Sequence, residues 1–282
     1  MKKNLINVTD LSSYIYCPRK YYLEKIKGLK QAPTKVMIEG KIRHEILEEF
    51  GKTELKFLEN FELINKEFTK KKMLICYENF VKKIIEDNFK KNMHIIKNFK
   101  INENEFASII FESMKEEIEL RAESVDNAIK KGFFGKELIL NLIPKYASEF
   151  YLESETLGIK GRADRIVFSD LTNKNIIPFE LKTREIQKIY LSDEIQLACY
   201  SLLLEEKFCT KIPVAILQAG NKKFEVLISS ELRQKVFDLI EQIRDIEKNL
   251  VFPSNFSKCQ TCAYEKECGE LKVISIKEKN EA

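Results

Sequence analysis

The feature that most constrains this chain is a long stretch without the residues that break helices. No glycine occurs from residue 52 to 131, and no proline from 34 to 143. Apolar side chains recur there at helical spacing, at Leu74, Tyr77, Val81 and Ile84 and again at Phe106, Ile110, Val125 and Ala128. The spacing predicts a bundle of several helices, which we treat as an insertion over residues 45–146. It is interpreted either as a solvated helical cap or as a lid over a groove.

The sequence after residue 147 has a different pattern. The segments "SEFYLESETLGIKG", "RADRIVFS" and "IIPFELKT" are predicted strands, separated by turn signals at Gly158 and in "DLTNKN". A helix, "SDEIQLACYSLLLEEKF", follows and is expected to be capped by Ser192. Two more strands around Gly220 and a last helix from residue 230 complete an α/β core, a mixed sheet flanked by helices.

The segment before the bundle is predicted to belong to the same core. "VTDLSSYIYCPRKYYLEKIKG" indicates a short helix capped by Thr9 or Asp10, then Cys17 and Pro18, then a basic and aromatic helix. The predicted organisation is therefore a core made of residues 1–44 and 147–282, interrupted by the helical insertion.

Composition narrows the class of protein only slightly. The 48 basic and 44 acidic residues give a net charge of +4, which is too balanced to indicate a nucleic-acid partner by itself. No apolar run reaches the roughly 20 residues that span a bilayer, and "MKKNLINVTD" lacks the apolar segment of a signal peptide. We therefore expect a cytoplasmic protein with no membrane partner. In that compartment its seven cysteines are expected to be thiols or metal ligands.

Two predicted strands carry carboxylates in apolar surroundings. In "PFELKT", Glu180 and Lys182 are two residues apart and face the same side, whereas Phe179 and Leu181 face the core. If this strand pairs with "GRADRIV" as a hairpin, Asp164 meets Glu180. Two such carboxylates repel each other unless a divalent cation lies between them, and oxygen ligands suit Mg²⁺ or Mn²⁺. The alternative is that each carboxylate forms a structural salt bridge with a neighbouring Arg or Lys.

Two residues of the following helix help to decide between a metal site and structural salt bridges. Gln196 and Tyr200 lie four apart on the following helix, so they share a face, and the convergence of four polar positions favours a metal site.

Near the end, "CQTCAYEKEC" supplies Cys259, Cys262 and Cys268, one short of the four ligands that a metal or cluster usually needs. Three further cysteines in apolar stretches are expected to be core residues: Cys76, Cys199 and Cys209.

These motifs resemble those of a known family. "GRAD", "FELK" and "QLACY" are similar to the GxxD, ExK and QxxxY motifs of RecB-type nucleases in the PD-(D/E)XK superfamily, and "EGKIRH", which ends in His44, resembles their upstream helical histidine. The cysteines resemble the iron–sulfur branch, which includes the small CRISPR-associated RecB-like exonucleases and AddB-type nuclease domains. The resemblance covers residues 9–50 and 150–268. The long helical insertion departs from the compact members.

The resemblance implies a restriction-endonuclease-like core in which a cluster joins the two chain ends. Its expected ligands for a 4Fe–4S cluster are Cys17, Cys259, Cys262 and Cys268, with Zn²⁺ as the alternative occupant. Its expected ligands for Mg²⁺ or Mn²⁺ are His44, Asp164, Glu180 and the Leu181 carbonyl. The catalytic set adds Lys182, Gln196 and Tyr200. His94 has no such context and is expected to be a surface or core residue.

The implied function is metal-dependent hydrolysis of DNA, by an exonuclease acting on single-stranded ends. In the CRISPR-associated group such an enzyme trims DNA before spacer integration and works beside an integrase. The alternatives are a DNA repair nuclease that partners a helicase and a non-catalytic iron–sulfur module that binds DNA. Four residues of the second helix either grip a single strand or pack under the cluster: Arg19, Lys20, Tyr21 and Tyr22.

Overall fold

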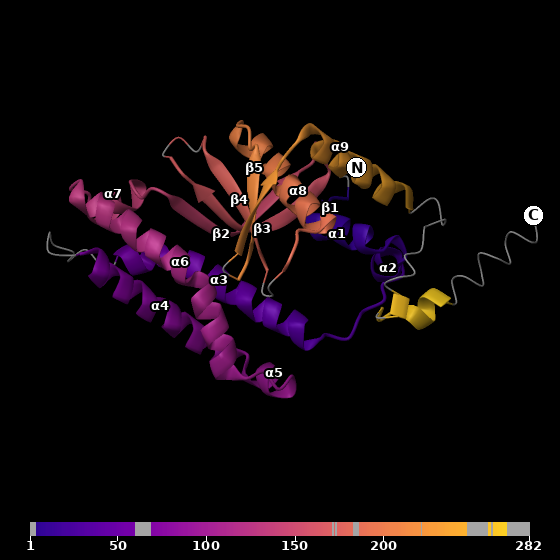
Figure 1. Cartoon of the computed structure of the whole chain (residues 1–282), viewed down its shortest axis with the longest axis horizontal. Helices are drawn as coiled ribbons and strands as arrows, with labels where there is room; N and C mark the ends of the chain where they lie inside the picture. Colours follow the sequence, from indigo (N-terminus) through magenta and orange to yellow (C-terminus); the bar gives the residue numbers. More distant parts are fainter. Residues whose placement is uncertain are drawn as a thin grey trace, which may run out of the picture.

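The protein is described by a computed structural model that covers residues 4–59, 69–170, 172, 174–182, 186–220, 222–246, 259–260 and 262–269. A mixed sheet lies between two sets of helices (Figure 1). Its six strands are β1 (Ile6–Asn7), β2 (Lys145–Ser154), β3 (Ile159–Phe168), β4 (Ile176–Lys182), β5 (Val214–Ala219) and β6 (Lys222–Leu227). The predicted strands and the hairpin around Gly220 are confirmed.

Strand β3 is the centre of the sheet. It pairs along its whole length with antiparallel β2, while its other edge holds β1 at the start and antiparallel β4 at the end. Strand β4 then pairs with parallel β5, and β5 with antiparallel β6. The mixed α/β core predicted from the sequence is thus observed.

The predicted hairpin of β3 and β4 is also present, and its pairing ends next to the two predicted carboxylates. Arg165 pairs with Phe179, so the same register places Asp164 opposite Glu180. The regular pairing ends at Arg165 and Phe179, and beyond it the Leu181 N–H donates to the Asp164 carboxylate (2.7 Å). The two strands therefore separate at the two carboxylates that the sequence singled out.

One face of the sheet is covered by α1 (Val8–Tyr16), α8 (Leu191–Phe208) and α9 (Ser230–Ile246), which share a hydrophobic core with it. Gly161 permits this contact: a Cβ there would lie 2.8 Å from the Val8 side chain and 3.0 Å from the Tyr200 ring. The glycine of "GRAD" therefore allows α1 and α8 to approach β3 closely.

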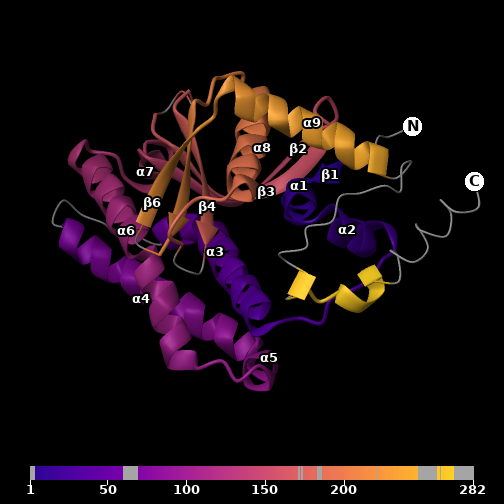
Figure 2. The ribbon, with the colours of Figure 1, turned by 45° about the vertical axis from the view of Figure 1, so that its right-hand side comes forward.

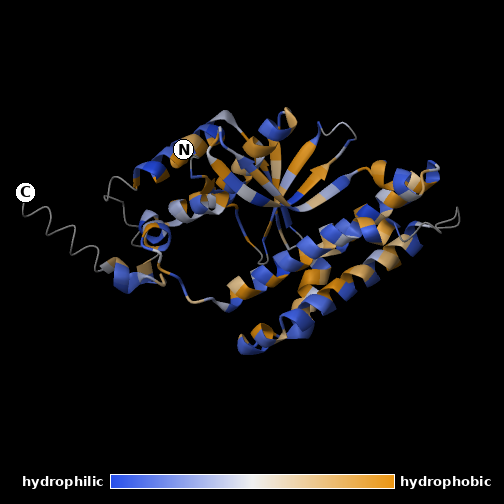
Figure 3. Ribbon diagram, turned by 180° about the vertical axis from the view of Figure 1, so that it is seen from behind, coloured by the Kyte–Doolittle hydropathy of each residue, from blue (hydrophilic) through white to orange (hydrophobic). Residues whose placement is uncertain are grey.

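The helical bundle covers the opposite face. It consists of α3 (Lys35–Glu59), α4 (Lys70–Lys91), α5 (Met93–Asn98), α6 (Glu103–Lys130) and α7 (Gly135–Leu140). Figure 3 shows hydrophobic and hydrophilic residues alternating along these helices, as expected when one side is buried. Phe179 and Leu181 of β4 lie in the core of the bundle, which confirms that they face inward.

The two ends of the described chain lie side by side. Residues 259–260 and 262–269 run next to α2 (Pro18–Tyr21) and the π-helix Tyr22–Ile26 that follows it (Figure 2). A contact joins them, because Arg19 Nη1 lies 3.7 Å from Cys268 Sγ. None of the helices in the described ranges combines the length and the apolar character needed to cross a bilayer.

Three local predictions were wrong. Helix α1 is capped at Asn7, not at Thr9 or Asp10, and the Asp10 carboxylate accepts the Asn7 N–H (3.2 Å). Helix α8 starts after Tyr190, so Ser192 lies inside its first turn. Cys209 is exposed, because it is the left-handed residue (φ 50°) that ends α8.

The other expectations for isolated residues have mixed outcomes. Cys199 is buried in the core as expected, while Cys76 is only partly buried. His94 is exposed on α5, so of its two expected places it takes the surface.

Candidate active site

Three buried carboxylates lie on neighbouring strands at the point where β3 and β4 separate. Glu149 of β2, Asp164 of β3 and Glu180 of β4 have side chains that are 8%, 5% and 7% exposed. Glu149 is opposite Asp164, because Ser148 pairs with Arg165 and Phe150 with Ala163. Like charges directly opposite each other destabilise a sheet. We call these three residues the acidic cluster, and it needs a compensating positive charge.

Helix α3 brings His44 to this cluster. Its Nδ1 atom lies 2.7 Å from Glu149 Oε1 and 3.5 Å from Asp164 Oδ1. The hydrogen bond to Glu149, with a smaller effect from the charge of Asp164, raises the pKa of His44 to about 9 against the opposing effect of burial. Within the described residues, His44, Glu149 and Asp164 form the one group of at least three His, Cys, Asp or Glu ligand atoms that lie within 4.8 Å of one another.

Glu149 is a site residue that was not predicted from the sequence. Its position depends on a left-handed backbone conformation (φ 51°) in the middle of β2, which non-glycine residues adopt only when the surroundings impose it. In the sequence it is one glutamate in a predicted strand, indistinguishable from a solvent-facing one. Only the register between β2 and β3 could have identified it.

The second half of the site is built on β4 and α8. Lys182 Nζ lies 3.0 Å from Glu180 Oε1 and 3.1 Å from Asp193 Oδ1. From α8, Gln196 Nε2 donates to Glu180 Oε2 (2.6 Å) and lies 3.4 Å from Tyr200 Oη. The structure thus brings together the sequence-predicted residues Asp164, Glu180, Lys182, Gln196 and Tyr200.

The pKa values of Glu180 and Lys182 in this half of the site are both raised from their ordinary values. Burial, followed by the charge of Asp164, raises the pKa of Glu180 to about 8. Burial alone would lower the pKa of Lys182, but the carboxylates of Glu180 and Asp193 outweigh it and raise that pKa. The lysine is therefore held in its cationic form between the carboxylates of Glu180 and Asp193.

Arg43, the residue before His44, was also missed. It is buried at 6% exposure, and its Nε atom has no hydrogen-bond partner. Burial lowers its pKa, and the nearby charges of Asp164 and Arg165 act on it in opposite directions. Its long side chain thus adds positive charge near Asp164.

The donor set fits a hard divalent cation. Carboxylate oxygens suit both Mg²⁺ and Mn²⁺, whereas an imidazole is a ligand for transition metals, of which Mn²⁺ is one. The geometry supports this fit, because one ligand atom each of His44, Glu149 and Asp164 lie within 4.8 Å of one another.

A comparison with protein families decides the class of this site. The family model described as the PD-(D/E)XK nuclease superfamily matches residues 6–269, which include His44, the acidic cluster, Lys182 and the candidate cysteines. The chain belongs to this superfamily. Membership indicates a metal-dependent nuclease that acts on DNA. Comparison with curated proteins gave no match.

The four residues that follow Pro18 differ in burial and in contacts, and both of their expected roles stay predictions. Tyr21 and Tyr22 are each 5% exposed, so both pack inside the protein and offer no surface for a DNA base. Lys20 pairs with Glu24 (2.8 Å) and lines an open pocket, while Arg19 points to Cys268.

The cysteine residues lie at this junction of the chain ends. Cys17, Cys259, Cys262 and Cys268 are all partly buried. They come from the two segments that lie side by side, although their sulfur atoms do not meet the 4.8 Å criterion that the His44 group satisfies. Tyr264, between Cys262 and Cys268, is buried at 3% exposure beside Glu24, and burial followed by that carboxylate raises its pKa to about 12.

Proposed function

We propose that the protein is a Mg²⁺- or Mn²⁺-dependent exonuclease that hydrolyses phosphodiester bonds at single-stranded DNA ends. The observation that carries the proposal is the meeting of His44 and the acidic cluster with Lys182, at the point where β3 and β4 separate. The pockets that adjoin Lys182 are open, which suits a chain end that must enter and leave.

The proposed ligands of the divalent cation are His44, Asp164, Glu180 and the Leu181 carbonyl. Glu149 accepts a hydrogen bond from His44 and holds its ring in place, as carboxylates often do for metal-binding histidines. When bound, the cation would lower the pKa of a water molecule and offset charge on the phosphate.

The remaining polar residues have distinct tasks in the proposal. Lys182 presents a fixed positive charge where negative charge develops on the scissile phosphate, because Glu180 and Asp193 hold its ammonium group. Gln196 fixes the Glu180 carboxylate by a 2.6 Å hydrogen bond. Tyr200 supports Gln196 from the next turn of α8.

Two variants test these assignments because they fail differently. Glu180→Ala is expected to lose Mn²⁺ binding in a calorimetric titration and to lose cleavage of end-labelled single-stranded DNA. Lys182→Ala is expected to bind Mn²⁺ but to cleave at least about a hundredfold more slowly, as for other single transition-state contacts. His94→Ala is the control and should match the wild type. If Glu180→Ala and Lys182→Ala cleave at the wild-type rate, the proposal is wrong.

We further propose that Cys17, Cys259, Cys262 and Cys268 hold a 4Fe–4S cluster that joins the chain ends. The adjacency of the two segments supports this, as does Arg19, whose guanidinium donates toward Cys268 Sγ and would stabilise a thiolate. Protein purified without oxygen should be brown and contain iron and sulfide, and Cys17→Ala should bleach it. A colourless protein with one zinc per chain would establish the Zn²⁺ alternative.

The proposed biological role is trimming of DNA before CRISPR spacer integration, with an integrase as partner. This role rests on the resemblance of the cysteine and nuclease motifs to that group. A neighbouring integrase gene, and cleavage that stops at a fixed length when purified integrase is added, would support it. A neighbouring helicase gene, with cleavage stimulated by that helicase, would instead establish the repair role.

A further inference from the structure

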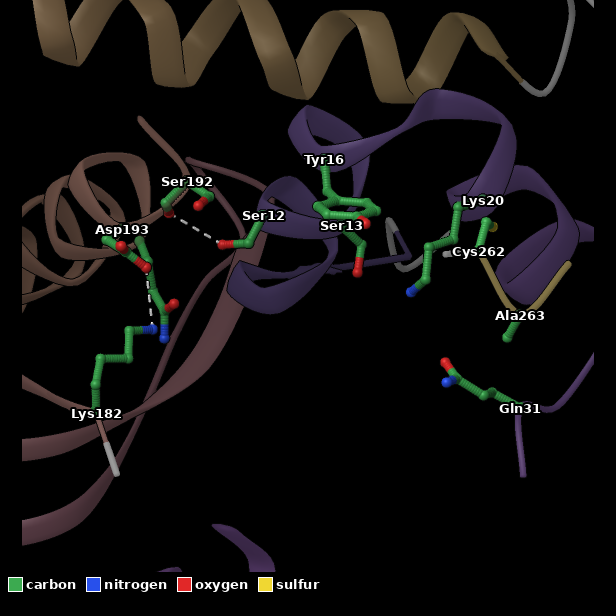
Figure 4. Close-up of a pocket in the computed structure, with 11 residues that line it drawn as sticks. Ser12, Ser13, Tyr16, Lys20, Gln31, Lys182, Ser192, Asp193, Cys262 and Ala263 are labelled. Atoms are coloured by element: carbon green, nitrogen blue, oxygen red, sulfur yellow. Dashed lines mark hydrogen bonds and ion pairs between the residues drawn. The ribbon is translucent and has the colours of Figure 1, made fainter. Parts of the chain in front are cut away.

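Two hollows meet at Lys182. The first has a volume of about 370 Å³ and runs from Lys182 past α1 to Cys262, as Figure 4 shows. The second has a volume of about 480 Å³ and runs from Lys182 toward Tyr190 at the start of α8. Both are lined by Tyr16, Lys182, Ser192 and Asp193, so they adjoin each other beside the proposed catalytic lysine.

Two tyrosines line the hollows: Tyr16 lines both of them, and Tyr190 lines the second. Tyr16 of α1 is 38% exposed, and Tyr190 is 49% exposed. Their exposure contrasts with that of Tyr21 and Tyr22, which are buried although they lie in the more basic segment. Exposed aromatic rings beside cations are the usual platform for the bases of a single strand.

The positively charged side chains in and beside the hollows can contact the phosphates of a DNA strand while its bases contact the tyrosines. Figure 4 shows the polar ends of Lys20 and Gln31 directed into the first hollow, opposite Lys182. Lys188 lies 5.7 Å from the centre of the Tyr190 ring. Of the described residues that line either hollow, Asp193 is the acidic one.

Asp193 does not oppose this arrangement. Its carboxylate contacts Lys182 Nζ (3.1 Å) and the backbone N–H of Tyr190 (3.4 Å). The Ser12 hydroxyl, which donates to the Ser192 carbonyl (3.2 Å), ties α1 to the start of α8 and fixes the distance between the two tyrosine-bearing elements.

We infer that the two hollows hold successive nucleotides on either side of the scissile phosphate, with one base stacked on Tyr16 and the other on Tyr190. The inference deepens the proposed function and rests on it, since it takes Lys182 as the point of cleavage. It also predicts a preference for single strands, because the bases of a duplex are already stacked on one another.

The test separates base contacts from phosphate contacts. Binding of a fluorescent ten-nucleotide thymidine oligomer is measured by anisotropy in EDTA, so that no cleavage occurs. A ten-unit abasic oligomer of the same charge is measured beside it. Tyr16→Ala and Tyr190→Ala should each weaken binding of the thymidine oligomer about tenfold, within the usual range for one stacked base. Neither should change binding of the abasic oligomer.

Matched variants complete the design. Tyr16→Phe and Tyr190→Phe keep the ring and should bind as the wild type does. Tyr151→Ala removes an equally exposed tyrosine (50%) that lines neither hollow, and it should have no effect. Thermal unfolding of each variant checks that the fold is retained.

The outcomes distinguish this inference from the proposed function. If the alanine variants bind both oligomers as tightly as the wild type, or weaken both equally, the stacking inference is overturned even if Mn²⁺ supports cleavage. If the selective loss is seen but the wild type cleaves nothing with Mg²⁺ or Mn²⁺, the stacking sites stand and the nuclease proposal fails.

Discussion

Two consecutive residues of β3, Asp164 and Arg165, belong to two buried charge clusters of opposite character. Asp164 is part of the acidic cluster. Arg165 belongs to a second group, which we call the paired cluster and which lies between the sheet and the helical bundle: Glu54, Glu117, Arg121 and Arg165. The paired cluster contains two acids and two bases, so its formal charges cancel. The acidic cluster has three carboxylates, and its cationic neighbours are Lys182, His44 and Arg43.

The contacts of the paired cluster show how its two arginines compensate the charges of its two carboxylates. Arg121 donates from Nε to Glu117 (2.9 Å), forms an ion pair with Glu54, and lies over the rings of Phe50 and Tyr146 (4.8 and 4.4 Å). Arg165 forms an ion pair with Glu117. Burial alone would raise the pKa of Glu117, but the two arginines outweigh it and lower that pKa.

The acidic cluster shows the opposite behaviour, since burial and Asp164 raise the pKa of Glu180 to about 8. Both clusters are equally buried, so burial by itself does not identify a functional site. The difference lies in the partners: Glu117 contacts two buried arginines, whereas Glu180 contacts Lys182 and Gln196 and is close to the charge of Asp164. The salt-bridge alternative considered for the two carboxylates stays open, since Glu180 forms an ion pair with Lys182 (3.0 Å).

The largest predicted effect on stability comes from unbalancing the paired cluster. Glu117→Gln leaves Arg121 and Arg165 buried with one carboxylate fewer, and loss of one partner of a buried ion pair typically costs about 3–5 kcal/mol. Chemical denaturation should show a loss of this size in the free energy of unfolding. Lys70→Met breaks a pair whose members are 49% and 51% exposed and serves as the control. A loss below about 1 kcal/mol would mean that the buried ion pairs of Glu117 do not stabilise the fold appreciably.

The second prediction concerns Mn²⁺. A ligand that binds only the folded state at 100 times its Kd raises the free energy of unfolding by about 2.7 kcal/mol. We expect a gain of this order for the wild type and none for Asp164→Ala, measured by thermal unfolding with and without EDTA. Glu117→Gln should keep the metal-dependent gain even though its baseline is lower. Equal gains in the wild type and Asp164→Ala would place the cation elsewhere.

These clusters also show which site residues can be predicted from the sequence and which cannot. Glu180, Lys182 and Asp164 were found because strand alternation and hairpin pairing are local rules. Glu149 was not, since its place depends on an unusual φ and on the register with a second strand. The paired cluster was missed because Glu54, Glu117 and Arg165 are far apart in sequence and meet only when the bundle packs on the sheet.

The helical zone shows the same limit. Its apolar spacing predicted helices, and the structure contains them. Spacing did not reveal that α3, which carries His44, begins at Lys35 and packs directly against the sheet. The bundle therefore forms one wall of the core, and the assignment of residues 45–146 as a separate insertion stays a prediction.

A third prediction uses pH to distinguish the clusters. In metal-free protein the folded-state pKa values of Glu180 and His44 are raised from 4.5 to about 8 and from 6.5 to about 9. The folded state thus binds more protons than the unfolded state, so its stability should fall as pH rises from about 5 to 9. Denaturation in EDTA across this range should show the fall, and Glu180→Gln should reduce its slope. With Mn²⁺ the slope should flatten or reverse, because the cation binds the deprotonated groups. Equal slopes with and without the metal would contradict the assignment.

The smallest predicted effect comes from Glu116, the residue before Glu117. Its carboxylate also joins α6 to the sheet, through Lys223 of β6 (2.5 Å), but the two side chains are 55% and 35% exposed. Exposed ion pairs contribute about 0–1 kcal/mol, since water screens the charges and two flexible side chains must be ordered. We expect Glu116→Gln to change the free energy of unfolding by less than about 0.5 kcal/mol and to become indistinguishable from the wild type at high salt. Comparing it with Glu117→Gln holds the helix, the residue type and the bridged layers constant while burial changes. If the two variants lose similar stability, the ion pairs act as surface contacts in both places, and the contrast between the paired cluster and ordinary salt bridges disappears.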